Sequence, residues 1–260
     1  MKSERKVAIV TGSATGIGAA TAARLAGLGY NLVVNYSKSE AEAKAVAATC
    51  EAAGAETLGL RADVADDAAC RRLVDQTMAK WGRIDALVNS AGTTKYVDHA
   101  DLEGQTAEDF QRAFAVNVCG VFQMVRAVAP HMKAAGGGAI VTVSSIAGVT
   151  GTGSSIAYAA SKAAVNTMTL SLARVLAPEI RINAICPGFV ATRWQRDGLG
   201  AKYDQVVARV AATTPLRHAL TADDVAESVV MLIEGGRYIT GETLLVDSGL
   251  HLDMAPLRIR

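Results

Sequence analysis

The residues with the clearest chemical potential in this sequence are a tyrosine and a lysine four positions apart, Tyr158 and Lys162. On a helix this spacing places both side chains on one face, one turn apart. An ammonium group near a phenol favours the phenolate, so we expect the pKa of Tyr158 to lie below its ordinary value of about 10. The pair indicates general acid–base chemistry suited to a carbonyl and its alcohol. Because such pairs are common on helices, the pair alone leaves a purely structural interpretation open.

Two other polar residues stand where they could support that chemistry. The apolar run 139–144 predicts a buried strand, and Ser145 follows at its carboxyl end, where ligands bind in open α/β folds. A Ser hydroxyl there can donate to a substrate oxygen as negative charge develops on it. Asn117 interrupts the apolar helical stretch 113–128, and a buried Asn needs hydrogen-bond partners. We expect Asn117 to hold a water molecule linked to Lys162.

The first apolar run leads through Thr11-Gly-Ser-Ala-Thr-Gly-Ile-Gly18 into an Ala-rich helix. A strand that enters a helix through a glycine turn offers backbone N–H groups and the positive end of the helix dipole to a phosphate. Gly12 allows the turn, Gly16 allows a ligand to approach the backbone, and Gly18 allows close packing. The G-x-G-x-x-G fingerprint is absent because Thr21 stands at its last small position. A glycine turn that only packs is therefore the alternative interpretation.

The end of the second apolar run bears on the choice of dinucleotide. Many dinucleotide-binding folds place an acidic residue there to hold the adenosine ribose, but this chain has Asn35, Tyr36, Ser37 and Lys38. Ser37 and Lys38 can bond and neutralise a 2′-phosphate, and no carboxylate stands there to repel it. The sequence therefore favours NADP(H) over NAD(H). The alternative is that Lys38 is a solvated charge that opens the next helix.

Short apolar runs rich in Val and Ile alternate with helical patterns along the chain. The runs show almost no polar alternation, so we expect each strand to be covered on both faces, as in a parallel sheet between helices. We predict an α/β fold: a single doubly wound (Rossmann) domain over 1–260 with a seven-stranded parallel sheet. The irregular stretch 188–215 is too long for a plain connection, and we expect it to be a substrate lid. The predicted strands are 7–10, 31–35, 55–60, 86–89, 139–144, 180–186 and 243–246.

The composition argues against several classes of protein. The 260 residues are 50% hydrophobic and 20% charged with a formal net charge of +1, so nucleic acid and anionic membranes are poor partners. No apolar run approaches the roughly 18 residues of a membrane span, and the N-terminus lacks the apolar core of a signal peptide. The cysteines and histidines stand apart from one another, which predicts neither a metal site nor a redox dithiol. We expect a cytoplasmic protein.

Together these motifs resemble those of the short-chain dehydrogenase/reductase family over nearly the whole chain. The stretch 11–18 resembles the family's T-G-x-x-x-G-x-G turn. Asn89-Ser-Ala-Gly92 resembles its N-N-A-G segment, with Ser90 as a departure. Ser145 stands thirteen residues before Tyr158, as in the family. The combination is highly specific, whereas each motif alone is not.

The resemblance implies a role for each of these residues. Ser145 polarises a carbonyl, and Tyr158 gives or takes the proton. Lys162 binds the nicotinamide ribose and tunes Tyr158, while Asn117 completes a proton relay. Thr192 belongs to a P-G-x-x-x-T stretch that borders the nicotinamide. The residues implied to bind the cofactor are Gly12, Ser13, Ala14, Thr15, Gly16, Ile17, Gly18, Tyr36, Ser37, Lys38, Asp63, Val64, Asn89, Ala91, Gly92, Tyr158, Lys162, Pro187, Gly188, Val190 and Thr192.

By the same resemblance, the protein is an NADPH-dependent oxidoreductase that interconverts a ketone and a secondary alcohol by hydride transfer. The 3-oxoacyl-thioester reductase branch is nearest, and a sugar, polyol or other small-alcohol dehydrogenase using NAD(P) is the alternative. Members that accept an acyl-carrier protein present basic residues beside the site, yet 134–137 and 178–179 offer none, leaving Lys133 and Arg181. Some NADP-using members also place a basic residue where this chain has Thr15. A non-catalytic NADP-binding sensor or scaffold is a remote alternative on the same fold.

Substrate choice is expected to depend on 93–104, 146–155 and the stretch after 188, where Trp194, Gln195 and Tyr203 could line an entrance. Three interpretations of Trp194 are equally consistent with the sequence: it forms a wall of the site, it lies on the surface, or it contacts another subunit.

Two helical stretches bear on assembly. Small residues in the helix 158–177 and the apolar stretch 113–128 permit close helix contact. Family members usually pair through these two helices, so the resemblance implies a homotetramer. The alternative is that both helices simply pack on their own sheet.

Overall fold

The computed structural model describes residues 3–252, so the two ends of the predicted domain, 1–2 and 253–260, lie outside the described residues. Its centre is a seven-stranded sheet in which all neighbouring strands are parallel, in the order β3-β2-β1-β4-β5-β6-β7. The predicted α/β class, the doubly wound topology and the seven strand positions are confirmed. The strands are β1 (Val7–Thr11), β2 (Asn31–Tyr36), β3 (Thr57–Arg61), β4 (Ala86–Asn89), β5 (Gly138–Val143), β6 (Ile180–Pro187) and β7 (Thr243–Val246).

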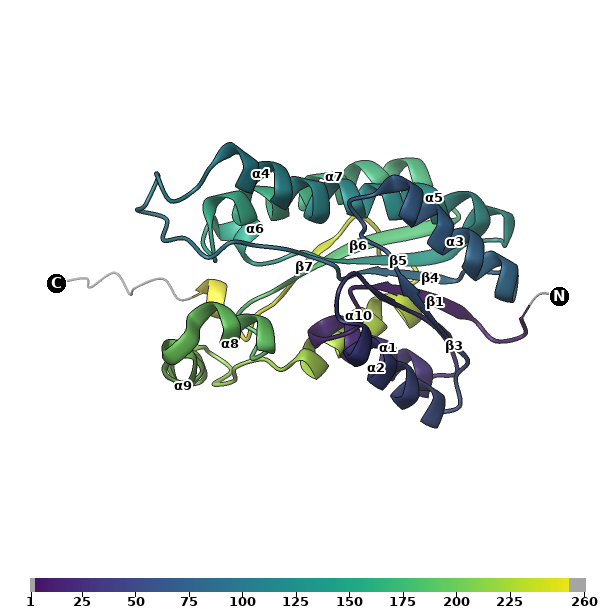
Figure 1. Ribbon diagram of the computed structural model, residues 1–260, viewed down its shortest axis with the longest axis horizontal. Helices are drawn as coiled ribbons and strands as arrows, with labels where there is room; N and C mark the ends of the chain where they lie inside the picture. The colour runs from purple at the N-terminus through teal and green to yellow at the C-terminus, as the bar shows by residue number, and fades with distance from the viewer. Residues whose placement is uncertain (1–2, 253–260) are drawn as a thin grey trace.

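The connections between strands are helical, and their helices form a layer on each face of the sheet (Figure 1). Because parallel neighbours must be joined by a crossover, each connection from one strand to the next contains at least one helix. The helices are α1 (Gly16–Gly27), α2 (Glu40–Ala52), α3 (Asp67–Trp81), α4 (Ala107–Phe114), α5 (Gly120–Ala134), α6 (Ala147–Thr150), α7 (Ile156–Leu176), α8 (Arg193–Leu199), α9 (Tyr203–Thr213) and α10 (Ala222–Glu234), with a π-helical turn η1 (Ala115–Cys119) and the 3-10 turns η2 (Gly200–Lys202) and η3 (Leu250–Leu252).

The strand order reverses at β1. The chain passes from β1 to β2 and β3 on one side, and then returns to place β4 on the other side of β1. In this register Val10 pairs with Val34 of β2, while Thr11 pairs with Asn89 of β4. The segments that leave β1 and β4 therefore diverge, and a crevice is expected between them at the carboxyl ends of the strands. Open α/β sheets bind their ligands in such a crevice.

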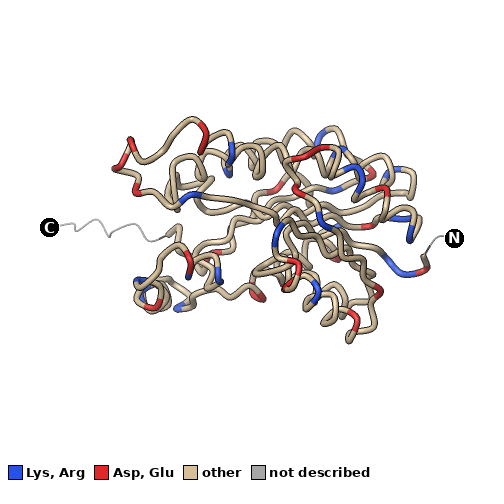
Figure 2. The backbone as a smooth tube through the Cα atoms, viewed as in Figure 1, with Lys and Arg blue, Asp and Glu red and all other residues tan. Residues whose placement is uncertain are grey.

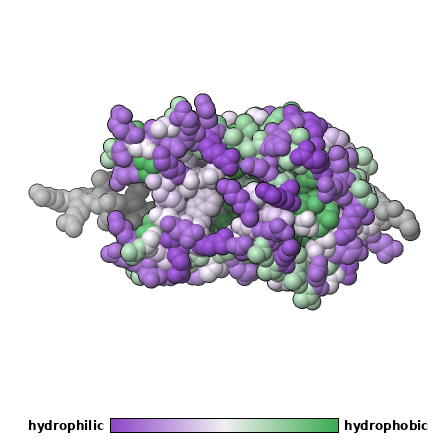
Figure 3. Space-filling model, viewed as in Figure 1, coloured by the Kyte–Doolittle hydropathy of each residue, from purple (hydrophilic) through white to green (hydrophobic). Residues whose placement is uncertain are grey.

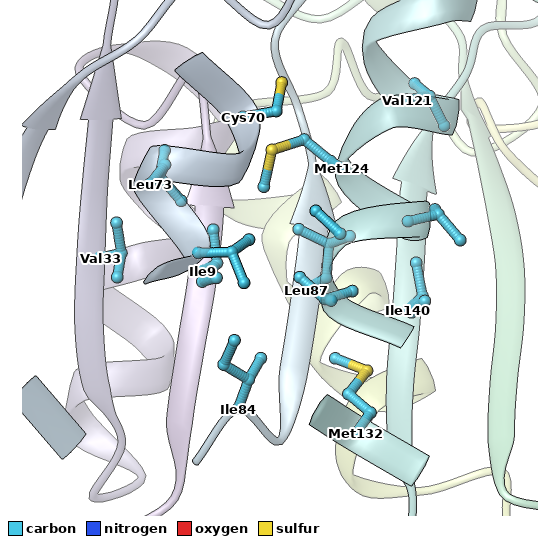
Figure 4. Packing of buried hydrophobic residues seen from close by; sticks show 14 of the residues in the cluster. Ile9, Val33, Cys70, Leu73, Ile84, Leu87, Val121, Met124, Met132 and Ile140 are labelled. Atoms are coloured by element: carbon cyan, nitrogen blue, oxygen red, sulfur yellow. The ribbon is translucent and has the colours of Figure 1, made fainter. Parts of the chain in front are cut away.

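Alternation along each strand divides the core into two layers. In β1, Val7 and Ile9 are buried with α3, α5 and α7, whereas Ala8 and Val10 are buried with α1, α2 and α10. Successive side chains of a strand point to opposite faces, so a run of consecutive apolar residues requires cover on both. Figure 4 shows the first layer, in which side chains of α3 and α5 meet those of the central strands.

The stretch 188–215 is more regular than the sequence predicts. It contains α8 and α9 joined by η2 rather than irregular chain. These elements bury little of themselves: α8 has no buried residue, and α9 buries only Tyr203. In Figure 1 they lie at one end of the molecule, on the side of the sheet away from α4 and α6. Segments with few buried contacts open at low cost, which suits the predicted lid.

One helical segment has the length and composition of a membrane span. Ala107–Ala134 contains an 18-residue window with a mean hydropathy of 1.4, half of which is buried inside the protein. This corrects the expectation that no stretch approaches that length. The buried half packs against the sheet through residues such as Met124 and Val128. Core helices of globular proteins share this composition, so burial accounts for it.

Positions of Lys and Arg alternate with positions of Asp and Glu along the helices of both layers (Figure 2). Several form ion pairs, such as Arg24 with Asp223 at 2.6 Å and Arg126 with Asp67 at 2.5 Å.

Candidate active site

A cavity of about 620 Å³ opens at the carboxyl ends of the strands, in the crevice beside β1. The loops after β1 to β6 contribute to its wall, together with α7 and α8. On the face drawn in Figure 3, hydrophilic residues surround a hollowed centre that contains paler and hydrophobic residues. The residues of the wall that the sequence predicted are Gly12, Ala14, Thr15, Gly16, Ile17, Tyr36, Ser37, Lys38, Asp63, Val64, Ala91, Gly92, Ser145, Tyr158, Lys162, Pro187, Gly188, Val190 and Thr192.

Four predicted site residues lie behind this wall rather than in it: Ser13, Gly18, Asn89 and Asn117. Ser13 is fully buried, and its hydroxyl donates to the Val10 carbonyl at 2.7 Å. Asn89 is buried at the end of β4, where its amide nitrogen lies 3.4 Å from the Thr142 hydroxyl. The side chains of Ser13 and Asn89 therefore stabilise the strand ends that support the cavity wall.

The glycine turn after β1 has the geometry of a phosphate cradle. Gly12 adopts φ +63°, and a Cβ there would lie 2.7 Å from the Cα of Ala91. A Cβ on Gly18 would lie 2.5 Å from the carbonyl oxygen of Gly12. Gly16 differs, because a Cβ there would meet nothing nearer than the Thr192 methyl at 4.0 Å. The turn needs Gly12 and Gly18 for its own packing, whereas the space before Gly16 is free for a ligand at the start of α1.

Asn35 ties this turn to the neighbouring strands. It is buried at the end of β2, and its Oδ1 accepts from the Gly12 N–H at 3.0 Å. Its Nδ2 donates to the carbonyls of Leu60 and Ala62 at 3.2 and 3.1 Å. From the sequence, Asn35 is notable only because many dinucleotide-binding folds have an acidic residue near this position. In the folded protein its side-chain amide holds the glycine turn against the end of β3.

The end of the cavity beyond Asn35 is positively charged. Ser37 and Lys38 line it, and the Arg61 guanidinium donates to the Ser37 carbonyl at 3.2 Å. Among the described residues of the wall, the only carboxylate is that of Asp63, which lies 3.7 Å from Arg112. This end of the cavity is therefore suited to an anionic group.

At the other end, three predicted catalytic side chains converge: Ser145, Tyr158 and Lys162. The Ser155 hydroxyl caps α7 by accepting from the Tyr158 N–H at 3.2 Å, which places Tyr158 in the first turn. Lys162 follows one turn later. Its Nζ lies 5.6 Å from the centre of the Tyr158 ring and donates to the Val143 carbonyl at 2.8 Å. Ser145 extends from the end of β5 toward the phenol.

Burial shifts the pKa values of Tyr158 and Lys162, and the shift of Tyr158 is opposite to the one expected from the sequence. Burial raises the pKa of Tyr158 to about 12, and a hydrogen bond with the Ser145 side chain opposes part of this rise. Burial also lowers the pKa of Lys162 to about 8. The expected lowering of the Tyr158 pKa by the ammonium is wrong, because surrounding protein atoms disfavour the charged form of each group and set both directions. Tyr158 is therefore a protonated donor at neutral pH.

Asn117 lies in the π-helical turn η1 and is buried. Its Oδ1 accepts from the Thr93 N–H at 2.8 Å, and its Nδ2 donates to the Thr93 carbonyl at 3.0 Å and to the Ser161 hydroxyl at 2.9 Å. The side chain thus clamps the segment after β4 against α7. A water-mediated link from Asn117 to Lys162 stays a prediction.

Known proteins with similar sequences cover almost the entire chain. The family described as Enoyl-(Acyl carrier protein) reductase matches residues 12–251. A Streptomyces violaceoruber protein described as ketoacyl reductase 2 of the granaticin polyketide synthase is 42% identical over 249 residues, covering 96% of this chain and 97% of the relative. The 3-oxoacyl-[acyl-carrier-protein] reductase FabG of Staphylococcus aureus (strain Mu50) is 33% identical over 249 residues, covering 95% and 98%. The chain belongs to the short-chain dehydrogenase/reductase family.

A solved structure agrees with this membership. The crystal structure of a Burkholderia xenovorans protein, described as a short-chain dehydrogenase/reductase, is 42% identical with a TM-score of 0.90. It covers 96% of this chain and 100% of that chain. As a short-chain dehydrogenase/reductase, the protein is an oxidoreductase that acts on CH–OH or C=O groups of small molecules with NAD(P), and it is ketoacyl reductase-like by homology.

The residues of this short-chain dehydrogenase/reductase fit the dinucleotide that its family uses. The free space before Gly16 admits a pyrophosphate at the start of α1, where Thr15 makes no side-chain cap and leaves the backbone N–H groups available. The anion-binding end and the converging Ser145, Tyr158 and Lys162 lie at the two ends of the same cavity.

Several residues of the wall were not predicted. Arg112 lines the cavity with Val116, four residues on, so helical spacing could have indicated both. Arg193 of α8 pairs with Glu42 of α2 at 2.8 Å across 151 residues, and no local signal reveals such a pair. Leu250 of η3 likewise reaches the wall from the far end of the chain.

The expected entrance residues divide into two groups. Trp194 and Gln195 line the cavity. Tyr203 is buried instead, with its ring centre 6.5 Å from that of Phe189, so it supports the wall from behind.

Proposed function

We propose that this short-chain dehydrogenase/reductase reduces a ketone to a secondary alcohol with NADPH and catalyses the reverse reaction. The observation that supports this is the shared cavity. A glycine turn and a cationic end suited to a phosphorylated dinucleotide lie at one end, and two hydroxyl donors with a lysine lie at the other. We propose Asn117, Ser145, Tyr158 and Lys162 as the catalytic residues, and the predicted residues of the wall as the cofactor site.

The roles of the side chains follow from their placement. When bound, the dinucleotide supplies or accepts the hydride. Ser145 and Tyr158 donate to the carbonyl oxygen, on which negative charge grows in the transition state. The high pKa of about 12 keeps the Tyr158 proton in place until that oxygen becomes basic enough to take it. Lys162, held by the Val143 carbonyl, places a positive charge behind the phenol and stabilises the phenolate that remains.

Lys38 is proposed to select NADP(H) by binding the 2′-phosphate. A hydrogen bond to a charged group contributes about 1.5 to 3 kcal/mol, so Lys38→Gln should lower kcat/KM for NADPH by about 10- to 100-fold. The value for NADH should change little. Lys44→Gln is the matched control, because Lys44 pairs with Glu40 on the exposed surface of α2 at 2.8 Å. Calorimetric titration of both cofactors separates binding from turnover. Equal losses with the two cofactors, or an NADH-preferring native protein, would contradict this assignment.

The proposed substrate resembles a 3-oxoacyl thioester in having a ketone at the reacting carbon. An acyl-carrier protein is less favoured as partner, because Lys133 lies 3.7 Å from Glu179 and Arg181 donates to the carbonyls of Leu232 and Ile233. NADPH and NADH consumption should be measured side by side with β-ketoacyl thioesters, enoyl thioesters, ketoses, quinones and cyclic ketones. Tight NADPH binding without turnover of any carbonyl would instead favour a non-catalytic sensor or scaffold.

We also propose that the protein is a cytoplasmic homotetramer of single-domain subunits, with 188–215 as the lid of each. Apolar side chains on the two helices expected to pair support the association: Phe122 of α5 is 42% exposed and Leu170 of α7 is 46% exposed. Light scattering at micromolar concentration tests the assembly, and a monomer there would rule it out.

A further inference from the structure

The half of the cavity around Tyr158 is almost free of charge. Apart from Lys162, the charged side chains in the described wall are Lys38, Asp63, Arg112 and Arg193. These four belong to the other half, since Lys38 follows β2, Asp63 pairs with Arg112 after β3, and Arg193 pairs with Glu42 of α2. A charged substrate body would lose its hydration around Tyr158, where the one charged side chain of the described wall, Lys162, already donates to the Val143 carbonyl. This half therefore suits an uncharged body next to the reacting carbonyl.

The same half is rich in aromatic rings. Phe, Trp and Tyr make up only 5% of the chain, yet Tyr96, Phe189 and Trp194 join Tyr158 in this wall. The Trp194 ring lies 6.5 Å from the Tyr158 ring, centre to centre, with an angle of 54° between their planes. Its outer edge lies 3.7 Å from the Cβ position of Gly92. The indole thus makes a tilted aromatic contact with the phenol ring, and both side chains face the same end of the cavity.

Trp194 is held in place although its helix buries little. The Tyr96 hydroxyl donates to the Gln195 side-chain oxygen at 3.1 Å, and it also lies 3.4 Å from the Trp194 carbonyl. The Tyr96 ring packs so closely on Gly198 that no side chain fits there. The segment that carries Tyr96 is itself anchored, since the Val97 N–H donates to the Ser154 carbonyl at 2.9 Å. Tyr96 therefore fixes α8, and with it the indole.

We infer that Trp194, positioned by Tyr96, selects the substrate: an uncharged ketone with a planar ring attached to or fused beside its carbonyl. The ring lies against the indole while the carbonyl oxygen meets Ser145 and Tyr158. Aromatic pairs in offset or tilted arrangements are favoured beyond the area that they bury, which a puckered ring or an alkyl chain does not reproduce. This inference rests on the proposed function and narrows its substrate class.

Two ketones of similar size test the inference: acetophenone, whose ring is planar, and cyclohexyl methyl ketone, whose ring is puckered. Trp194→Leu keeps an apolar side chain and removes the aromatic face, whereas Trp194→Phe keeps an aromatic face. We expect Trp194→Leu to lower kcat/KM for acetophenone by about three- to tenfold relative to cyclohexyl methyl ketone. The loss should lie mainly in KM, and Trp194→Phe should retain most of the native ratio. Comparing variants cancels the different intrinsic reactivities of the two carbonyls.

Tyr96→Phe provides a second, independent variant. It removes the hydroxyl that holds α8 while the ring stays against Gly198, so we expect a smaller shift in the same direction. NADPH affinity, measured by calorimetry, should be unchanged in all three variants, and their thermal midpoints should match that of the native protein.

The outcomes separate this inference from the proposed function. Equal losses for both ketones in Trp194→Leu, or an unchanged ratio in all variants, would overturn the selection by Trp194. Turnover of aliphatic thioesters or sugars with no turnover of either ring ketone would overturn it as well, and the proposed reaction would still stand. If NADPH binds and no carbonyl is reduced, the proposed function itself is wrong and the inference falls with it.

Discussion

Replacing Tyr158 by phenylalanine should lower kcat for ketone reduction by about 10² to 10³, the usual loss when one preorganised donor to a developing oxyanion is removed. The change removes the proposed proton source and one of the two proposed donors to the carbonyl oxygen, and it leaves the ring in place near Lys162 and Trp194. Because both donations strengthen as charge forms, the loss should appear in kcat rather than in KM alone. Steady-state NADPH oxidation by the purified variant measures it.

The control for this substitution is Tyr238→Phe. Tyr238 is 90% exposed and lies outside the cavity, so losing its hydroxyl should leave turnover unchanged. Tyr158→Phe should still bind NADPH through the glycine turn and Lys38, which shows that the cavity is intact. A Tyr158→Phe protein with normal turnover would remove Tyr158 from the mechanism, and with it the assignment of Ser145 and Lys162 as its partners.

The sheet could be predicted from the sequence because its signal is local. Each strand is a run of consecutive apolar residues, and such a run can be buried only if helices cover both faces, as β1 illustrates with Ile9 in one layer and Val10 in the other. The glycine turn was predictable for the same reason. Gly12 adopts a left-handed backbone conformation, and Gly18 packs directly against the carbonyl oxygen of Gly12. Both requirements for glycine therefore arise within the same short segment.

What escaped prediction depends on contacts between distant parts of the chain. Arg193 meets Glu42, and Tyr96 fixes α8 through Gln195, only because the fold brings loops from different strands to one edge. The helices of the stretch 188–215 bury too little apolar surface to show a clear periodic pattern, so the stretch reads as irregular. Many residues of the wall could be predicted from the sequence, whereas the distances between them could not, and their roles stay a proposal.

The direction of the Tyr158 pKa shift could not be predicted from the sequence. The spacing of Tyr158 and Lys162 correctly places them one turn apart, but spacing carries no information on solvation. In the folded protein Lys162 is buried and Tyr158 is partly buried in the cavity wall, and this loss of hydration raises the pKa of Tyr158 and lowers that of Lys162. The two directions have consequences for catalysis that can be measured.

Alcohol oxidation is expected to accelerate about tenfold for each pH unit between pH 6 and pH 8, because a group titrates tenfold per unit when the pH is far below its pKa. In the proposed mechanism, oxidation requires the Tyr158 phenolate to take the alcohol proton, and the pKa of Tyr158 is about 12. Had the ammonium alone set this pKa near neutrality, the rate would level off near pH 7. Initial rates with NADP⁺ and a secondary alcohol, at constant ionic strength, distinguish the two cases.

Ketone reduction should show the opposite dependence. The phenol is protonated at every pH used, so the limiting group is Lys162, which carries its charge below its pKa of about 8 and loses it above. Reduction should therefore be nearly constant below pH 8 and fall above it. In Lys162→Arg the guanidinium stays charged beyond about pH 12, so the fall should disappear whatever the absolute rate of the variant. A fall at the same pH in Lys162→Arg, or an oxidation plateau below pH 8 in the native protein, would mean that groups other than this buried pair control proton transfer.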